Sequence, residues 1–81
     1  MARIDKLIAK AKKSPQNLRF EEFVTLVTRV GVYSLHGNPS GSHWTFEKSG
    51  QYPITLTKTG GKAKVEEVKK VVQRFREEGL I

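Results

Sequence analysis

The sequence predicts a single α+β domain in which helices cover one face of a three-stranded antiparallel sheet. Three segments repeat apolar residues every three or four positions, which indicates amphipathic helices. In the middle of the chain apolar and polar residues alternate, which indicates half-exposed strands. A chain of 81 residues is long enough for one compact core and too short for two. We therefore treat residues 1–81 as one domain with the order helix, helix, three strands, helix.

The predicted helices lie at both ends of the chain. The first spans Arg3 to Lys13 and is strongly basic on its polar side. Asn17 is placed to cap the second helix and Gly31 to end it. The last helix has the most regular apolar pattern and ends near Gly79. The apolar positions of the second and last helices are Phe20, Phe23, Val24, Val27, Val30, Val65, Val68, Val71, Val72 and Phe75.

The three predicted strands are Val32 to His36, His43 to Lys48, and Pro53 to Lys58. In the second and third strands every other residue is apolar, so one face of the sheet is expected to be buried. Lys48 to Gln51 supplies a turn between them, and His36 to Ser40 forms a longer connection. Gly60 and Gly61 are predicted to turn the chain into the last helix.

Composition narrows the function classes. Fifteen Lys and Arg against eight Asp and Glu give a net charge of +7, which attracts polyanions and makes nucleic acid the leading partner class. Such a charge also keeps a small protein soluble, so charge alone leaves both interpretations open. The absence of cysteine excludes disulfides and thiolate metal sites. Without a signal-peptide pattern or an apolar run near the roughly 20 residues of a membrane span, we expect a cytoplasmic protein without membrane contact.

Histidine is the side chain best suited to exchange protons near neutral pH. His43 begins the second strand on the face opposite Trp44 and Phe46, so alternation directs it to solvent. His36 lies at the end of a less regular strand and has a weaker case. Because a lone exposed histidine is more often inert than catalytic, position alone leaves both alternatives open.

Other catalytic chemistries have little support in the sequence. All acidic residues except Glu47 lie on predicted helices, and none forms a zinc or magnesium motif. Neither Ser40 nor Ser42 has the spacing of a Ser-His-Asp triad. Gly60-Gly61-Lys62 lacks the spacing of a nucleotide phosphate loop. The sequence therefore favours a site without metal or cofactor.

A site made of one imidazole and several cations suits RNA better than DNA. The RNA 2′-OH is an internal nucleophile beside the phosphate, so proton transfer and charge stabilisation suffice for cleavage. Lys58, Lys62 and Lys64 surround the predicted start of the last helix, where free backbone N–H groups also favour phosphate. These lysines are candidate phosphate-binding residues, with simple solvation as the alternative for each.

Three motifs resemble those of the HicA toxins, and together they cover most of the chain. They are Asn17 to Phe23 leading to Val30-Gly31, the strand start Gly41-Ser42-His43-Trp44-Thr45-Phe46, and Gly60-Gly61-Lys62 before a helix closing on Glu78-Gly79-Leu80. The Gly-Ser-His element with an aromatic residue three positions later is the most specific of them. Order and spacing both agree with the family.

The resemblance implies a double-stranded-RNA-binding-domain-like fold and ribosome-independent cleavage of messenger RNA by an mRNA interferase. It also implies neutralisation by a HicB antitoxin, with the toxin monomeric when free or heteromeric with its antitoxin. By resemblance His43 is the catalytic residue, and we include Ser42 beside it among the candidate RNA-binding residues. Two departures are the longer connection before Gly41 and Thr59, which stands where many members place a second histidine.

Two alternatives stay open at this point. A similar fold can hold double-stranded RNA by shape and phosphate contacts without cutting it. A basic face can also serve only to meet an acidic protein partner. The first alternative predicts salt-sensitive RNA binding that does not depend on His43.

Overall fold

The computed structural model describes residues 2–37 and 41–81. Its elements are α1 (Ala2–Lys13), the 3₁₀ turn η1 (Pro15–Asn17), α2 (Phe20–Thr25) with its π-helical extension η2 (Leu26–Val30), β1 (Ser34–Leu35), β2 (His43–Glu47), β3 (Ile54–Thr59), β4 (Lys62–Ala63) and α3 (Val65–Glu77). The predicted combination of helices and an antiparallel sheet is confirmed. Within the described residues the sheet has four strands in the order β1-β2-β3-β4, so the prediction of three strands is wrong.

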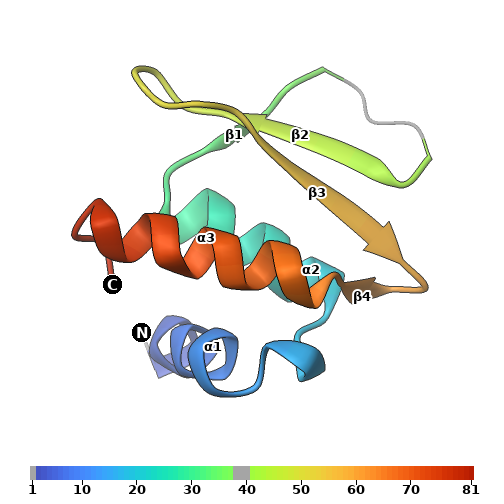
Figure 1. Ribbon diagram of the computed structural model, residues 1–81, viewed down its shortest axis with the longest axis vertical. Helices are drawn as coiled ribbons and strands as arrows, with labels where there is room; N and C mark the ends of the chain where they lie inside the picture. Colours follow the sequence, from blue (N-terminus) through green and yellow to red (C-terminus); the bar gives the residue numbers. More distant parts are fainter. Residues whose placement is uncertain (1, 38–40) are drawn as a thin grey trace.

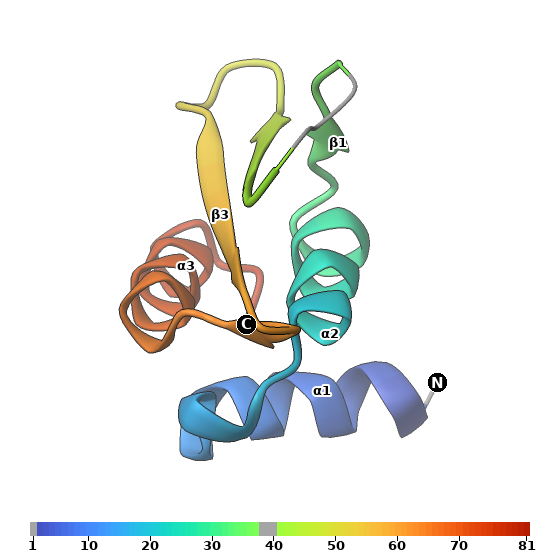
Figure 2. The ribbon, with the colours of Figure 1, turned by 90° about the vertical axis from the view of Figure 1, so that its right-hand side faces the viewer.

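The elements form layers. Figures 1 and 2 show α2 and α3 side by side against the β2–β3 hairpin, with α1 crossing these helices on the side away from the sheet. The core fills the space between the hairpin and the two helices and extends to α1 through Leu7 and Ala11. Its largest fully buried side chains are Phe23, Phe46, Phe75, Leu18, Leu26, Leu56, Val27 and Val68. On the face of the hairpin turned away from the helices, His43 and Thr55 are exposed.

The fourth strand corrects the prediction for the glycine pair. Gly60 and Gly61 have φ angles of 56° and 82°, the pattern of a two-residue hairpin turn that requires positive φ at both positions. The chain therefore reverses into β4, and α3 begins only at Val65. A strand of two residues is too short to show alternation, which is why the sequence pattern does not reveal it.

The other boundaries differ by smaller amounts. β2 and β3 lie within one residue of their predicted ends, whereas β1 keeps only the middle of the predicted Val32 to His36. The connection before β2 contains residues 38–40, which lie outside the described residues. Asn17 ends η1 rather than capping α2. The N-cap position of α2 is occupied by Arg19, whose main-chain N–H donates to Glu22 Oε1 at 2.9 Å.

Val32 carries backbone strain at the junction between η2 and β1. Among the described residues it is the one non-glycine with positive φ, at 58°, and its side chain is 66% exposed. The left-handed conformation costs an L-residue roughly 1–2 kcal/mol. Replacing Val32 by glycine relieves this cost, but about half of the gain is lost because glycine raises the conformational entropy of the unfolded chain.

We expect Val32→Gly to raise the free energy of unfolding by about 0.5–1 kcal/mol for this reason. Urea denaturation measures the change. Val30→Gly is the control, because Val30 lies in helical backbone and packs against the core, so its replacement lowers stability. A loss of stability in Val32→Gly would show that the backbone at this junction is not strained.

Candidate functional site

The strand register decides which side chains share the solvent face of the sheet. Directly opposed residues of antiparallel strands point to the same side. His43 lies opposite Thr57, and Thr45 lies opposite Thr55. Trp44, on the other face, packs edge-on against Phe20 with ring centroids 5.2 Å apart. His43 is exposed, as the alternation of the sequence predicts.

Thr57, the residue facing His43, is held in place by α3. Its main-chain N–H donates to Glu67 Oε1 at 2.7 Å, and its hydroxyl donates to Glu67 Oε2 at 2.6 Å. The strand edge is free there because β4 pairs only with Lys58 and Thr59. The carboxylate of Glu67 therefore takes the place of a neighbouring strand and fixes the sheet beside His43.

Lys58 does not join His43 on the solvent face. It lies on the same face of β3 as Ile54 and Leu56. Its Nζ lies 5.9 Å from the centre of the Phe20 ring, within cation–π range. Its main-chain N–H donates to the carbonyl oxygen of Ser42 at 2.7 Å. Lys58 and Ser42 are thus linked through the backbone, whereas the Lys58 ammonium lies on the helix side of the sheet.

Lys62 is the predicted cation that shares the face of His43. It pairs with Thr59, which follows Thr57 by two residues and so points to the same side. Two strand spacings across and two residues along separate the Cα atoms of His43 and Lys62 by about 12 Å. Lys64 lies between β4 and α3 and is exposed. α3 begins at Val65 rather than at the glycines, so Lys62 lies in β4 and Lys64 is the residue just before the helix.

Arg19 is a further cation near the candidate site, and the sequence pattern does not predict it as a site residue. The segment before α2 pairs with β4, and Arg19 lies directly opposite Lys62. Two main-chain bonds hold this pairing, from Ala63 N–H to the oxygen of Leu18 at 3.1 Å and from Phe20 N–H to the oxygen of Gly61 at 3.0 Å. The local signal is slight: exposed Arg19 stands between buried Leu18 and buried Phe20.

His36 lies on the same face of the sheet as His43. Its main-chain N–H donates to the oxygen of Thr45 at 2.8 Å, which places it across from Thr45. Its relation to His43 is that of a diagonal cross-strand neighbour, about 7–8 Å away. The His36 Nδ1 contacts Glu47 Oε2, so this imidazole is turned toward a carboxylate. His36 therefore offers a matched comparison for His43.

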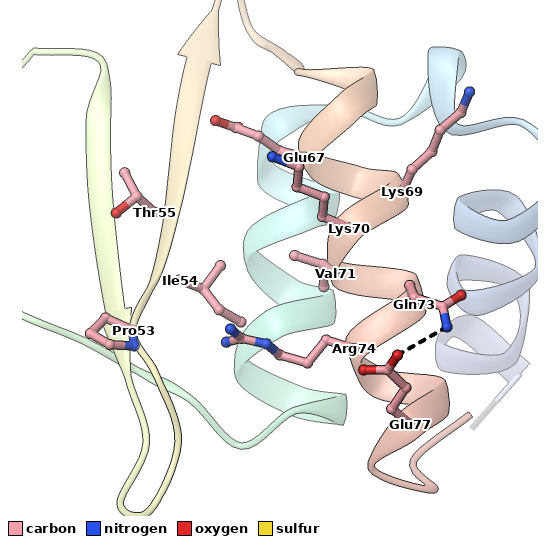
Figure 3. A pocket seen from close by; sticks show the side chains of 10 residues that line it. All are labelled: Pro53, Ile54, Thr55, Glu67, Lys69, Lys70, Val71, Gln73, Arg74 and Glu77. Carbon is pink, nitrogen blue, oxygen red and sulfur yellow. Dashed lines mark hydrogen bonds between the residues drawn. The ribbon is translucent and has the colours of Figure 1, made fainter.

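A groove of about 540 Å³ lies elsewhere, between β3 and α3 (Figure 3). Its lining residues are Pro53, Ile54, Thr55, Glu67, Lys69, Lys70, Val71, Gln73, Arg74 and Glu77. Two of these side chains already bind main-chain atoms of β3 and of the segment before it: Glu67 accepts from Thr57, and Arg74 Nη1 donates to the oxygen of Tyr52 at 2.8 Å. None of the residues predicted for the site lines this groove. The candidate site is accordingly the open solvent face of the sheet, which suits an extended chain better than a small molecule.

Within residues 2–37 and 41–81, no cluster of three or more histidine or acidic side chains is arranged to hold a metal ion. In the same part of the chain, the helices fall short of the length and apolarity that a membrane crossing requires. Comparison with family models, with curated proteins and with solved structures gave no match for this chain. The geometry of the site and the motifs of the sequence are therefore the basis for assigning a function.

Proposed function

We propose that this protein is a metal-independent endoribonuclease of the HicA toxin type that cuts messenger RNA with His43 as its acid/base residue. The observation that carries the proposal is the exposed imidazole on the face of the sheet opposite the core, with Lys62 on the same side. The Gly41-Ser42-His43 element and its resemblance to the HicA toxins support the assignment. An antiparallel sheet backed by helices also suits a double-stranded-RNA-binding-domain-like fold.

In the proposed reaction, His43 accepts the proton of a ribose 2′-OH while that oxygen attacks the adjacent phosphorus. The bond from phosphorus to the 5′-oxygen breaks, and the leaving oxygen takes a proton from solvent. The products are a 2′,3′-cyclic phosphate and a 5′-hydroxyl. Lys62 lies about 12 Å from His43 and so binds a neighbouring phosphate rather than the reacting one.

Cleavage of a chimeric substrate tests this chemistry. We expect the protein to cut single-stranded RNA in EDTA and to leave uncut the same strand with 2′-deoxyribose at the cleaved position, because the internal nucleophile is then missing. Gel electrophoresis and end-group analysis of the fragments give the readout. Cleavage of the deoxy substrate, or complete loss of cleavage in EDTA, would overturn the proposal. Binding of RNA without any cleavage would instead support the non-catalytic alternative.

The proposed physiological partner is a cognate HicB antitoxin, with action in the cytoplasm. An acidic antitoxin would complement the net charge of +7. Co-expression with the product of a neighbouring reading frame tests this part. Growth arrest by this protein alone, and its relief by the neighbour, is the expected result.

A further inference from the structure

Arg19 and Lys62 form a like-charge pair that the fold holds together. They are direct partners in an antiparallel bridge, so their Cβ atoms lie about 5 Å apart on one face of the sheet. Both side chains are exposed, and within the described part of the chain neither takes part in an ion pair. Like charges directly opposite each other destabilise a sheet.

Main-chain hydrogen bonds hold the two residues opposite each other. The main-chain bonds from Ala63 to Leu18 and from Phe20 to Gly61 bracket the pair on both sides. The nearby carboxylate of Glu22 is already engaged, because its Oε1 accepts from Lys10 Nζ and from the Arg19 N–H, both at 2.9 Å. Burial raises the pKa of Glu22, but these bonds and the charges of Lys10 and Arg19 outweigh it and lower the pKa.

We propose that Arg19 and Lys62 form a phosphate-binding subsite for single-stranded RNA. A phosphate between them relieves their mutual repulsion and accepts hydrogen bonds from both, with the guanidinium able to bind two oxygens at once. The subsite rests on the proposed function for the identity of its ligand. It lies on the face that carries His43, two strands away, so the RNA strand crosses the sheet from β2 toward β4.

The binding test uses a short 2′-O-methyl RNA, whose blocked hydroxyl prevents cleavage. We expect the double variant Arg19→Gln/Lys62→Gln to bind this RNA more weakly. The slope of log affinity against log salt should become shallower by about 0.7 for each phosphate that the variant no longer binds. Lys12→Gln/Lys13→Gln is the matched control, since it removes the same charge from exposed positions of α1. An equal effect of the two double variants would show that only net charge matters and would overturn the subsite.

A second readout needs no RNA. At low salt, Lys62→Gln is expected to melt at a higher temperature than the unmodified protein because it removes the repulsion with Arg19. Added salt should shrink this difference, because it screens exposed charges. A lower melting temperature for Lys62→Gln would contradict the unfavourable pairing on which the subsite depends.

The outcomes for the subsite and for the nuclease are distinguishable. Suppose that the protein fails to cut RNA, and that Arg19→Gln/Lys62→Gln loses oligonucleotide binding while the control Lys12→Gln/Lys13→Gln keeps it. The subsite then stands and the nuclease proposal falls. If the protein cuts RNA and Arg19→Gln/Lys62→Gln binds the oligonucleotide normally, the subsite falls. Loss of binding to an acidic peptide such as polyglutamate, with RNA binding retained, would also overturn it and would assign the pair to a protein partner.

Discussion

Replacing His43 by glutamine is expected to slow RNA cleavage by about 10²–10⁴-fold, the range that a general acid or base contributes. Glutamine keeps a polar side chain of similar reach but cannot accept and return a proton near neutral pH. His43 is exposed at the start of β2 and contributes nothing to the core, so the fold should be unaffected. Single-turnover cleavage of a labelled RNA, with enzyme in excess, isolates the chemical step.

His36→Gln is the matched control for this substitution. It removes the same kind of ring from the same face of the sheet, one strand away, where the imidazole contacts Glu47. We expect His36→Gln to keep most of the cleavage rate and both variants to unfold at the temperature of the unmodified protein. Undiminished cleavage by His43→Gln would remove the chemical basis of the proposed nuclease activity. Equal losses in the two variants would show that His43 is not the single proton carrier.

The parts of the fold that the sequence predicts are those set by local periodicity. α3 has a regular apolar stripe ending in Phe75, and β2 and β3 alternate cleanly, so their existence and faces follow from the pattern. The direction of His43 follows in the same way. Alternation also places Lys58 on the same face of β3 as the buried Leu56. The prediction that groups Lys58 with Lys62, because both lie near Gly60 in the sequence, overlooks that constraint.

The parts that the sequence does not predict depend on contacts between distant segments. β4 exists because Gly60 and Gly61 reverse the chain and because the segment around Arg19 pairs with it from the other side. No periodicity within Lys62–Ala63 announces this pairing. The proximity of Arg19 to Lys62, separated by more than half the chain, is visible only in three dimensions.

Gly31 follows the end of the helical segment, as the sequence predicts, but glycine is required there for a different reason. A glycine after an apolar helical stretch predicts a left-handed helix end. In the structure Gly31 has φ −80° and ψ −17°, which any residue can adopt, and the left-handed position is the next one, Val32. The requirement at Gly31 is for space, because the residue is buried where η2 meets Tyr33 and α3.

Gly31→Ala is therefore expected to lower the free energy of unfolding by about 3 kcal/mol, at the upper end of overpacking costs. An added Cβ would lie 2.4 Å from Cζ of Phe75, 2.8 Å from Cδ1 of Tyr33 and 2.8 Å from the oxygen of Val27. The first two contacts involve rings of the core, and the third involves backbone that cannot rotate away. For a domain of this size the loss corresponds to a fall in Tm of roughly 15 °C, which calorimetry measures directly.

A rescue experiment separates this steric cause from backbone strain. Phe75→Leu shortens the closest side chain, so it should destabilise the unmodified protein but cost less in the Gly31→Ala background, as residues in contact are not additive. Gly79→Ala is the comparison, because Gly79 has φ 76° and open space where a Cβ would be added. Its cost comes from backbone conformation alone and should be independent of Phe75→Leu. Strict additivity between Gly31→Ala and Phe75→Leu would mean that the helix end, rather than the ring of Phe75, dictates glycine at this position.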